Sequence, residues 1–140
     1  MLQINDHQVS EKLRTAGLRP TRQRVALAHL LFKNGDRHVT AEDLHEEAVG
    51  IRFPVSLATV YNTLNQFTTA GLLREVAIDG TKTYFDTNTS NHYHFYLEDE
   101  GRLIDIADND LRVVGLPEAP DGTSVSGIDV IVRLTSRARV

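Results

Sequence analysis

The stretch from Ser56 to Leu73 has the clearest periodic pattern of the chain. Its apolar residues recur at the spacing of one helix face, and this stripe consists of Leu57, Val60, Leu64 and Phe67. Ser56 is a residue type that caps helix starts, and Gly71 is a type that ends helices. The pattern therefore predicts an amphipathic helix over residues 56–70.

The face opposite this stripe is small, polar and uncharged. It carries Ala58, Thr59, Asn62 and Gln66, and no carboxylate occurs between Val55 and Leu73. Asn and Gln amides can pair with adenine through two hydrogen bonds, and Ala or Thr methyl groups suit the methyl group of thymine. This face is a candidate for reading DNA bases, and the alternative is an ordinary solvated helix face.

Three shorter helical patterns precede it, each starting at a capping residue and stopping near a glycine. They span Asp6–Gly17, Thr21–Gly35 and Thr40–Gly50. The residues that we expect to face inward are Val9, Leu13, Ala16, Val25, Ala28, Leu31, Leu44 and Ala48. The third and fourth helices are joined by a short connection that contains Pro54, which is the arrangement of a helix-turn-helix pair with the fourth helix as the reading helix.

After Leu73 the hydrophobic period changes to two. Strands are predicted over residues 74–78 and 81–86, around an Asp79-Gly80 turn that is a strong hairpin signal. Helices followed by a hairpin give the order of a winged helix. On this hairpin, Lys82 either touches a phosphate or protects a strand edge, and the sequence leaves both open.

The polar run of residues 87–91 marks the expected domain boundary, which gives domains of 1–86 and 87–140. Beyond it, strands are predicted over 93–97, 102–106 and 128–134, with a Pro/Gly/Ser-rich loop over 116–126. So few strands bury little apolar surface alone, which favours pairing across a twofold axis. The fold class predicted is α+β, an N-terminal winged helix-turn-helix followed by a small α/β dimerisation domain.

Charge is divided unevenly between the two halves of this 140-residue chain. Residues 1–84 hold ten Lys and Arg against nine Asp and Glu, whereas residues 85–140 hold five against ten. Five basic and no acidic residues lie between Lys12 and Arg24. A basic half that faces DNA and an acidic half with another task fit this asymmetry, and chance clustering is the alternative.

Several composition limits narrow the function class. The chain has no cysteine, so it has neither disulfides nor a thiolate metal site. No segment approaches the length of apolar chain that spans a membrane, and the first residues lack a signal core, so we expect a cytoplasmic protein. No nucleophile–base pair or phosphate-binding loop is recognisable, so we expect no enzyme.

His92 and His94 are the most suggestive pair of ligands. On a strand, residues i and i+2 point to one face, so both imidazoles can reach one ion, and two surface histidines are the alternative. Three further candidates sit at domain edges, namely His38, Asp86 and Asp105.

At several places the sequence resembles the ferric uptake regulator family, over roughly residues 8–106. The matching motifs are Ala-Glu-Asp-Leu at 41–44, Leu-Ala-Thr-Val-Tyr at 57–61, Leu-Asn-Gln-Phe at 64–67, Ala-Gly-Leu at 70–72 and His-x-His at 92–94. The lack of cysteine, the run from Gly17 to Phe32 and Asn-His-Tyr-His at 91–94 are similar to the haem-responsive iron response regulators of rhizobia and related alphaproteobacteria.

The resemblance implies one interdomain metal site. Its positions carry His38, Asp86, His92, His94 and Asp105, with each carboxylate one methylene shorter than the family's usual Glu. A second family site is lost, because its positions fall on Asn91, Tyr93 and Arg112, and the cysteine site is absent. The helix that usually precedes the last strand is interrupted by Gly115, Pro117, Pro120 and Gly122. Iron, manganese or zinc are the metals expected, with haem as a competing ligand of His92 and His94.

The resemblance also assigns DNA contacts. Tyr61 matches a tyrosine that approaches thymine, and Arg19 matches a basic residue that enters the minor groove. Asn62 stands where Arg is common, so the operator is expected to differ from the usual iron box. The residues expected at the DNA are Arg19, Arg22, Arg24, Thr59, Tyr61, Asn62 and Gln66.

The function predicted is a homodimeric, iron-status-responsive regulator of transcription that binds a double-stranded DNA operator. A divalent metal modulates DNA binding, as does haem, which arrives free or on a haem-delivering protein. The alternative, from another class, is a metal- or haem-binding carrier whose winged helix mediates protein contacts.

Overall fold

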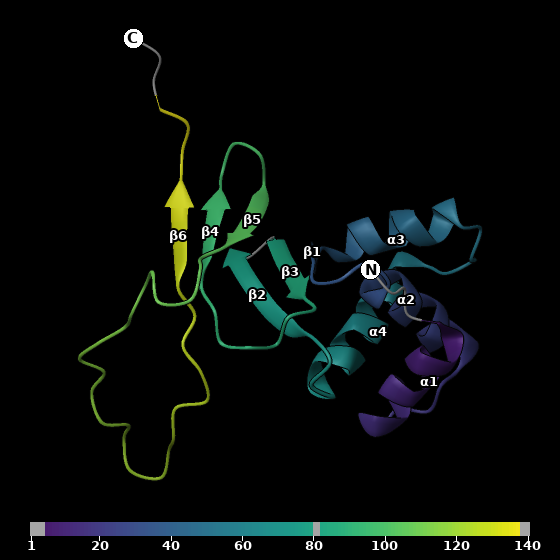
Figure 1. Ribbon diagram of the computed structural model, residues 1–140, viewed down its shortest axis with the longest axis horizontal. Helices are drawn as coiled ribbons and strands as arrows, with labels where there is room; N and C mark the ends of the chain where they lie inside the picture. The colour runs from purple at the N-terminus through teal and green to yellow at the C-terminus, as the bar shows by residue number, and fades with distance from the viewer. Residues whose placement is uncertain (1–4, 80–81, 138–140) are drawn as a thin grey trace. The chain divides into compact units, whose positions relative to one another are not determined.

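The chain divides into two compact units, Met1–Thr89 and Ser90–Val140. The computed structural model describes residues 5–79 and 82–137 (Figure 1). The boundary between the units falls three residues after the position expected from the polar run, which was Asp86. The turn residue Gly80 and the strand start Thr81, both expected from the sequence, lie outside the described residues.

Unit 1 begins with four helices, each preceded by a capping residue. They are α1 (Asp6–Thr15), α2 (Arg22–Phe32), α3 (Ala41–Gly50) and α4 (Leu57–Thr69). The caps of α2, α3 and α4 are Thr21, Thr40 and Ser56, as the sequence predicts, and their side chains accept backbone hydrogen bonds. The cap of α1 is Asn5 rather than the expected Asp6, which is the first residue of the helix.

The inner face of α4 differs by one position from the predicted stripe. Val60, Leu64 and Phe67 are fully buried, but Leu57 is 36% exposed and Thr63 is buried in its place. Thr63 can be buried because its hydroxyl donates to the Thr59 carbonyl at 2.9 Å and accepts from the Gln23 amide at 3.2 Å. A hydrogen-bonded threonine therefore lies among the apolar residues of the buried face of α4.

The sequence predicts helix ends at four glycines, of which Gly35 lies three residues beyond the last residue of α2, Phe32. Gly17 and Gly71 adopt left-handed backbone conformations just past α1 and α4. The predicted end of α3 at Gly50 is confirmed, since Gly50 is its last residue, but the left-handed residue after the helix is Arg52, with φ of 60°. The exposed Arg52 thus adopts a left-handed backbone conformation for which Gly is better suited.

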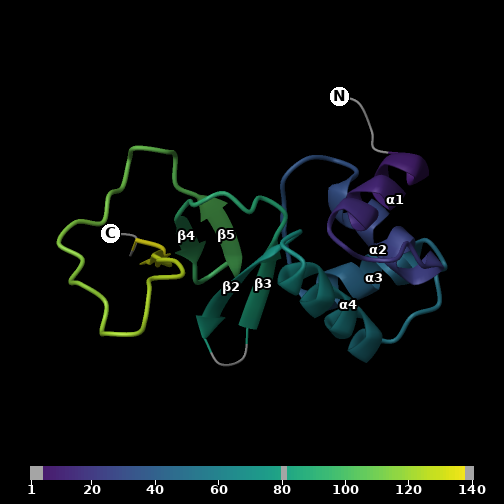
Figure 2. The same ribbon diagram turned by 90° about the horizontal axis from the view of Figure 1, so that it is seen from below.

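A three-stranded antiparallel sheet completes unit 1, and its two hairpin strands are seen in Figure 2. Its strands are β1 (His38–Val39), β2 (Arg74–Asp79) and β3 (Lys82–Asp86), in the order β1-β3-β2. The hairpin strands were expected, but β1 was not, because two residues are too short to show periodicity. Helices with a hairpin and a short third strand form a winged helix, so this part of the fold prediction is confirmed.

Unit 2 is organised on a second three-stranded sheet. It contains β4 (His94–Leu97), β5 (Arg102–Asp105) and β6 (Ile131–Leu134), in the order β5-β4-β6. β4 pairs antiparallel with β5 and parallel with β6. The segment 107–130 between β5 and β6 contains no helix, in agreement with the Gly and Pro residues that interrupt it, and Figure 1 shows it as a long excursion from the sheet.

The described residues contain no helix that is both long and apolar enough to cross a membrane.

Candidate nucleic-acid interface and metal ligands

The outer face of α4 is exposed because its inner face is fixed in the core. Ala58, Tyr61, Asn62, Asn65 and Gln66 all lie on the exposed side, whereas the buried side packs in the main hydrophobic cluster of unit 1. No acidic residue occurs in α4. The helix therefore presents amides and one phenol without a negative charge of its own, which suits approach to a phosphate-lined groove.

Tyr61 is held toward α3. Its hydroxyl donates to the Glu42 carboxylate at 3.3 Å. Partial burial, the negative charge of Glu42 and this hydrogen bond all raise the pKa of Tyr61 above its ordinary value. The phenol is thus a neutral donor at neutral pH.

Arg24 and Gln66 contact each other across α2 and α4. The Arg24 Nε and NH2 groups both donate to the Gln66 side-chain oxygen, at 3.2 and 3.1 Å, and NH1 donates to the Arg19 carbonyl at 3.0 Å. Arg24 was expected at a phosphate, and here its guanidinium is engaged within the protein. Arg19 and Arg22 are exposed.

Thr59, expected among the DNA contacts, takes part in the cap of α4. Its backbone N–H donates to the Ser56 hydroxyl at 3.1 Å, and its own hydroxyl accepts from the same group at 2.8 Å. Because these bonds satisfy both groups, the first contribution of Thr59 is to fix the start of the helix.

His45 is a residue that the sequence analysis did not assign. Its Nε2 lies 3.1 Å from the Val55 carbonyl, so the imidazole of α3 bonds to the residue just before the Ser56 cap. This bond fixes the turn from which α4 starts. The sequence carries no signal for it, since a lone histidine in a helix has many possible partners.

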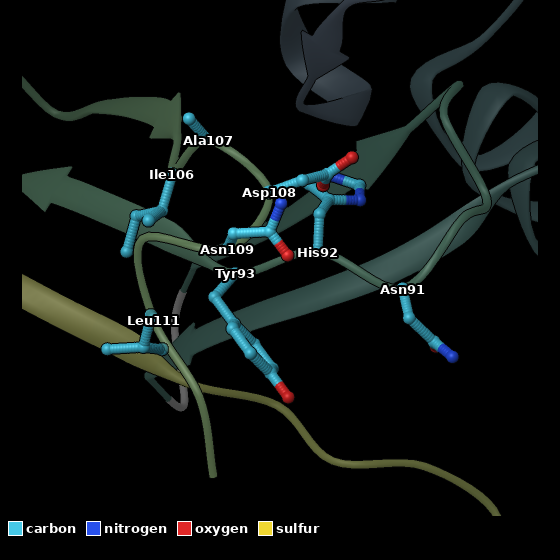
Figure 3. A pocket seen from close by; sticks show the side chains of 8 residues that line it. All are labelled: Asn91, His92, Tyr93, Ile106, Ala107, Asp108, Asn109 and Leu111. Atoms are coloured by element: carbon cyan, nitrogen blue, oxygen red, sulfur yellow. The ribbon is translucent and has the colours of Figure 1, made fainter.

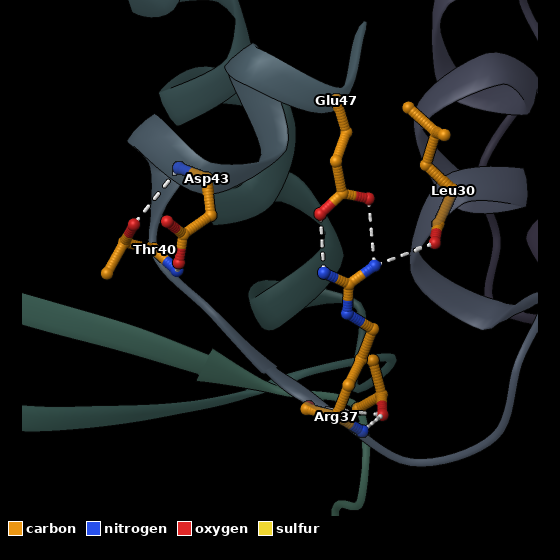
Figure 4. Close-up of polar contacts among 6 residues, drawn as sticks. Leu30, Arg37, Thr40, Asp43 and Glu47 are labelled. Atoms are coloured by element: carbon orange, nitrogen blue, oxygen red, sulfur yellow. Dashed lines mark hydrogen bonds and ion pairs between the residues drawn. The ribbon is translucent and has the colours of Figure 1, made fainter. Parts of the chain in front are cut away.

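Arg37 joins three parts of unit 1 (Figure 4). Its guanidinium forms a bidentate ion pair with Glu47 of α3, in which NH1 donates to Oε1 at 2.9 Å and NH2 donates to Oε2. NH1 also donates to the Leu30 carbonyl of α2 at 3.2 Å. Its backbone N–H donates to the Thr87 hydroxyl at 2.8 Å. The hydrogen bond to Glu47, and the charges of Glu47 and Asp43, raise the pKa of Arg37 against the opposite effect of burial.

His38, the residue after Arg37, is the first candidate metal ligand, and the register of the sheet places it opposite Asp86. His38 and Asp86 are direct partners across β1 and β3, so their side chains share one face. His38 Nε2 lies 3.2 Å from Asp86 Oδ2, and the other carboxylate oxygen accepts from the Asn88 backbone N–H at 2.9 Å. Asp86 is 1% exposed. Unit 1 therefore contributes one imidazole and one carboxylate at a single place.

Unit 2 brings together the other three candidates in the same way. His94 and Asp105 are direct partners across β4 and β5, and His92 lies two residues before His94. His92 Nε2 and His94 Nε2 each lie 3.3 Å from Asp105 Oδ1. Both histidines are buried. His92 lies just before β4 and not on a strand as expected, but the two imidazoles still converge on one carboxylate oxygen.

The tautomer of His92 makes its imidazole a suitable metal ligand. Its Nδ1 lies 2.7 Å from the Ser90 carbonyl, which only accepts, so Nδ1 carries a hydrogen and Nε2 of the neutral ring carries a lone pair. A lone pair that faces a carboxylate oxygen is repelled unless a proton or a metal ion lies between them. A ligating histidine whose other nitrogen donates to a carbonyl is the usual arrangement at metal sites, so these residues fit a divalent ion.

His92 also lines a pocket of about 410 Å³ in unit 2 (Figure 3). The other lining residues are Asn91, Tyr93, Ile106, Ala107, Asp108, Asn109 and Leu111. The pocket mixes amide, carboxylate and apolar groups, and Tyr93 extends along it with its hydroxyl at the far end. The His92 side chain is 4% exposed, so only a small part of it faces the pocket.

A winged helix with an uncharged reading face, followed along the chain by a sheet that carries imidazole and carboxylate ligands, defines the class of metal-responsive DNA-binding regulators. The profile of the ferric uptake regulator family matches residues 15–127, and the chain belongs to this family. Members of this family are regulators of transcription rather than enzymes.

Individual relatives agree with this assignment. The peroxide-responsive repressor PerR of Staphylococcus epidermidis is 37% identical over 108 residues, which is 74% of this chain and 71% of that protein. Among solved structures, the ferric uptake regulator of Pseudomonas aeruginosa with manganese has a TM-score of 0.71 and 27% identity, and the match covers 93% of this chain and 98% of that one. The Vibrio cholerae ferric uptake regulator, at 23% identity and a TM-score of 0.71, covers 91% and 98% and supports the α+β fold.

Proposed function

We propose that this protein is a homodimeric, iron-status-responsive regulator that reads operator DNA with α4, and that it belongs to the haem-responsive group within its family. Such a regulator acts in the cytoplasm. The observation that carries the proposal is the exposed face of α4, which offers Tyr61, Asn62 and Gln66 without any carboxylate on the same helix. The exposed Arg19 and Arg22 supply positive charge for phosphates.

The basic residues at the start of α2 support this orientation. α2 has no acidic residue in its first turn, and Arg22 and Arg24 occupy it instead. Cations at a helix N-terminus oppose the helix dipole, whereas a phosphate there is favourable. Arg22 therefore costs the free protein some stability that a DNA phosphate restores.

We also propose that the ligands of the two units hold one divalent ion. Unit 1 offers two ligands, His38 and Asp86, which are too few for a stable site, and unit 2 offers three, His92, His94 and Asp105. The donor set contains no sulfur, which suits Fe(II), Mn(II) or Zn(II). When bound, the ion supplies positive charge and a fixed ligand geometry that links the reading unit to unit 2.

Haem is the second ligand that we propose for His92 and His94. The support is the pocket beside His92, which Tyr93 also lines. Since an imidazole lone pair serves one metal at a time, haem and the divalent ion compete for the same nitrogens. Haem binding is then expected to lower DNA affinity.

The test uses the full chain and genomic DNA fragments that it retains on a column. Fluorescence anisotropy measures their affinity with a chelator, with Fe(II), with Mn(II) or Zn(II), and with Fe(II) plus haem. We expect the divalent ion to strengthen binding by about tenfold and haem to reverse this. Failure to retain any fragment at low salt would reject the DNA-binding role, whereas metal-independent binding would reject only the proposed sensor.

A further inference from the structure

We infer that Arg24 is a specificity-determining residue, because it holds the Gln66 side-chain oxygen and leaves Gln66 to present its amide nitrogen to the DNA bases. The inference rests on the proposed role of α4 in reading DNA. It adds a residue outside α4 to the set that selects the operator, and it names the base that this set prefers.

The contact itself fixes which atom of the amide faces Arg24. A guanidinium has only donors, so the amide atom that receives two of its N–H groups, at 3.2 and 3.1 Å, must be the oxygen of Gln66. The amide nitrogen then points away from Arg24. A glutamine with no such neighbour can turn its amide either way at little cost.

Arg24 is fixed in turn by its surroundings on α2. Its NH1 group donates to the Arg19 carbonyl at 3.0 Å, and its backbone N–H donates to the Thr21 cap at 3.2 Å. One residue earlier, the Gln23 amide donates to Thr63 of α4 at 3.2 Å, which ties the two helices together. The guanidinium is therefore a rigid partner for Gln66 and not a mobile surface charge.

This arrangement changes what Gln66 can recognise. The usual pairing of glutamine with adenine needs the amide oxygen to accept from adenine N6 while the amide nitrogen donates to N7. With the oxygen occupied by Arg24, only the donor half remains. Guanine presents two acceptors in the major groove, O6 and N7, so it becomes the best partner, and thymine O4 is next. Adenine offers its N7 acceptor only beside the N6 donor, and cytosine is the worst partner because its N4 group is a donor alone.

The positive charge of Arg24 acts in the same direction. It lies against the Gln66 amide and polarises the N–H groups, which strengthens their bonds to acceptors. Arg22 lies in the same first turn of α2 and gives a matched comparison. Within residues 5–79 and 82–137, its side chain forms no hydrogen bond or ion pair. Arg22 therefore contributes charge without directing any base-reading group.

The experiment selects binding sites from a randomised duplex library with the metal-loaded full chain. The parent should enrich guanine at one position, repeated symmetrically in the two half-sites. Arg24→Met frees the Gln66 oxygen, so the ratio of guanine to adenine at that position should fall about tenfold. Gln66→Glu keeps an acceptor for Arg24 but has no amide nitrogen, so guanine should be lost there in favour of cytosine, whose N4 donates.

Arg22→Met is the control, and it should weaken binding to all sequences while leaving every base preference unchanged. Arg24→Lys keeps a donor beside Gln66 and should retain part of the guanine preference. If the parent selects an operator and both Arg24→Met and Gln66→Glu select the same bases as the parent, the inference is overturned. A parent that selects no sequence would reject the proposed function, and the inference with it.

Discussion

Arg52 is the residue whose backbone conformation is least suited to its side chain. Its φ of 60° closes α3, with the Arg52 N–H bonded to the Val49 carbonyl and the Phe53 N–H to the Ala48 carbonyl, both at 2.9 Å. A residue with a Cβ pays roughly 1 kcal/mol or more for this region of backbone space, and glycine does not. The exposed guanidinium gives the position a charge at the turn before α4.

We expect Arg52→Gly to stabilise the folded chain by about 1 kcal/mol in urea unfolding. Glu46→Gly, at an exposed position inside the same helix, is the control and should destabilise it by about 1 kcal/mol. If both variants lose stability alike, the left-handed conformation of Arg52 is not under strain.

Tyr61 offers a second test at this scale, through its pKa. Glu42→Gln removes the charge and weakens the hydrogen bond that raise this pKa, so the Tyr61 pKa should fall toward its ordinary value. Because the folded pKa is raised, the contact stabilises the fold fully below the unfolded pKa of about 10 and is lost as pH rises through the folded value. Absorbance of the phenolate against pH, with Tyr61→Phe subtracted, measures it. Identical titrations of the parent and Glu42→Gln would show that Glu42 has no influence.

Single residues were predicted well where their partners are near in sequence. The caps Thr21, Thr40 and Ser56 bond within their own first turns, so the residue types alone reveal them. Arg24 and Gln66 are 42 residues apart, and their contact depends on how two helices pack, which no local pattern contains.

At the scale of elements, the ion pair of Arg37 and Glu47 connects α2, α3 and the strand that starts at His38. Both side chains are about one-third exposed, and the guanidinium satisfies a carbonyl of α2 as well. A partly buried bidentate pair is worth more than an exposed one, because water replaces it less well. The ion pair therefore fixes Arg37, the residue before the candidate metal ligand His38, to α3 of the helix-turn-helix.

Arg37→Met should therefore destabilise unit 1 by about 1.5–3 kcal/mol, the range for hydrogen bonds to charged groups. The matched control is Arg14→Met, which removes an exposed ion pair with Glu11 in which both side chains are 55% exposed. That variant should change stability by less than about 0.5 kcal/mol. Chemical unfolding measures both, and equal effects would mean that the Arg37 pair contributes nothing beyond a surface contact.

Elements were predictable in proportion to their length. The four helices carry several apolar repeats and a cap each, and all four appear within a few residues of the expected bounds. β1 consists of two residues that pair only because β3 lies beside them. β6 starts at Ile131 rather than Ile128, since alternation marks residues able to form a strand but not those that find a partner.

At the scale of the whole molecule, the hydrophobic core is unevenly shared. The main cluster of buried apolar residues lies entirely between Val9 and Phe85, within unit 1. Unit 2 has a three-stranded sheet and a long irregular segment, with exposed apolar residues that include Val114, 84% exposed, and Leu116, 54% exposed. Unit 1 has the means to fold alone, and unit 2 gains by covering its apolar surface with a second copy.

A fragment of residues 1–89 should therefore unfold cooperatively and sediment as a monomer, while the full chain sediments as a dimer. Sedimentation velocity at micromolar concentration distinguishes the two species. A monomeric full chain would remove the dimer from the proposed function, and a fragment that sediments as a dimer would move the interface to unit 1.

The single shared ion also makes a prediction for the whole chain. If one ion uses ligands from both units, His38→Ala and His92→Ala should each lower Mn(II) affinity at least about tenfold, and their double variant should still lose no more than one ion per chain. His7→Ala removes an exposed histidine outside both ligand groups and should change nothing. Calorimetric titration that finds two independent ions per chain would separate the two ligand groups into two sites.

The parallel pairing of β4 with β6 also sets an order of events on the ribosome. His94 of β4 lies opposite Ile131 of β6, so the whole segment after β5 must be synthesised before this pair can form. Domains fold as units from the N-terminus during synthesis, and pairing across a long loop is slow. The helices of unit 1 are complete much earlier, so we expect a nascent chain to form the exposed face of α4 before β6 completes the sheet of unit 2.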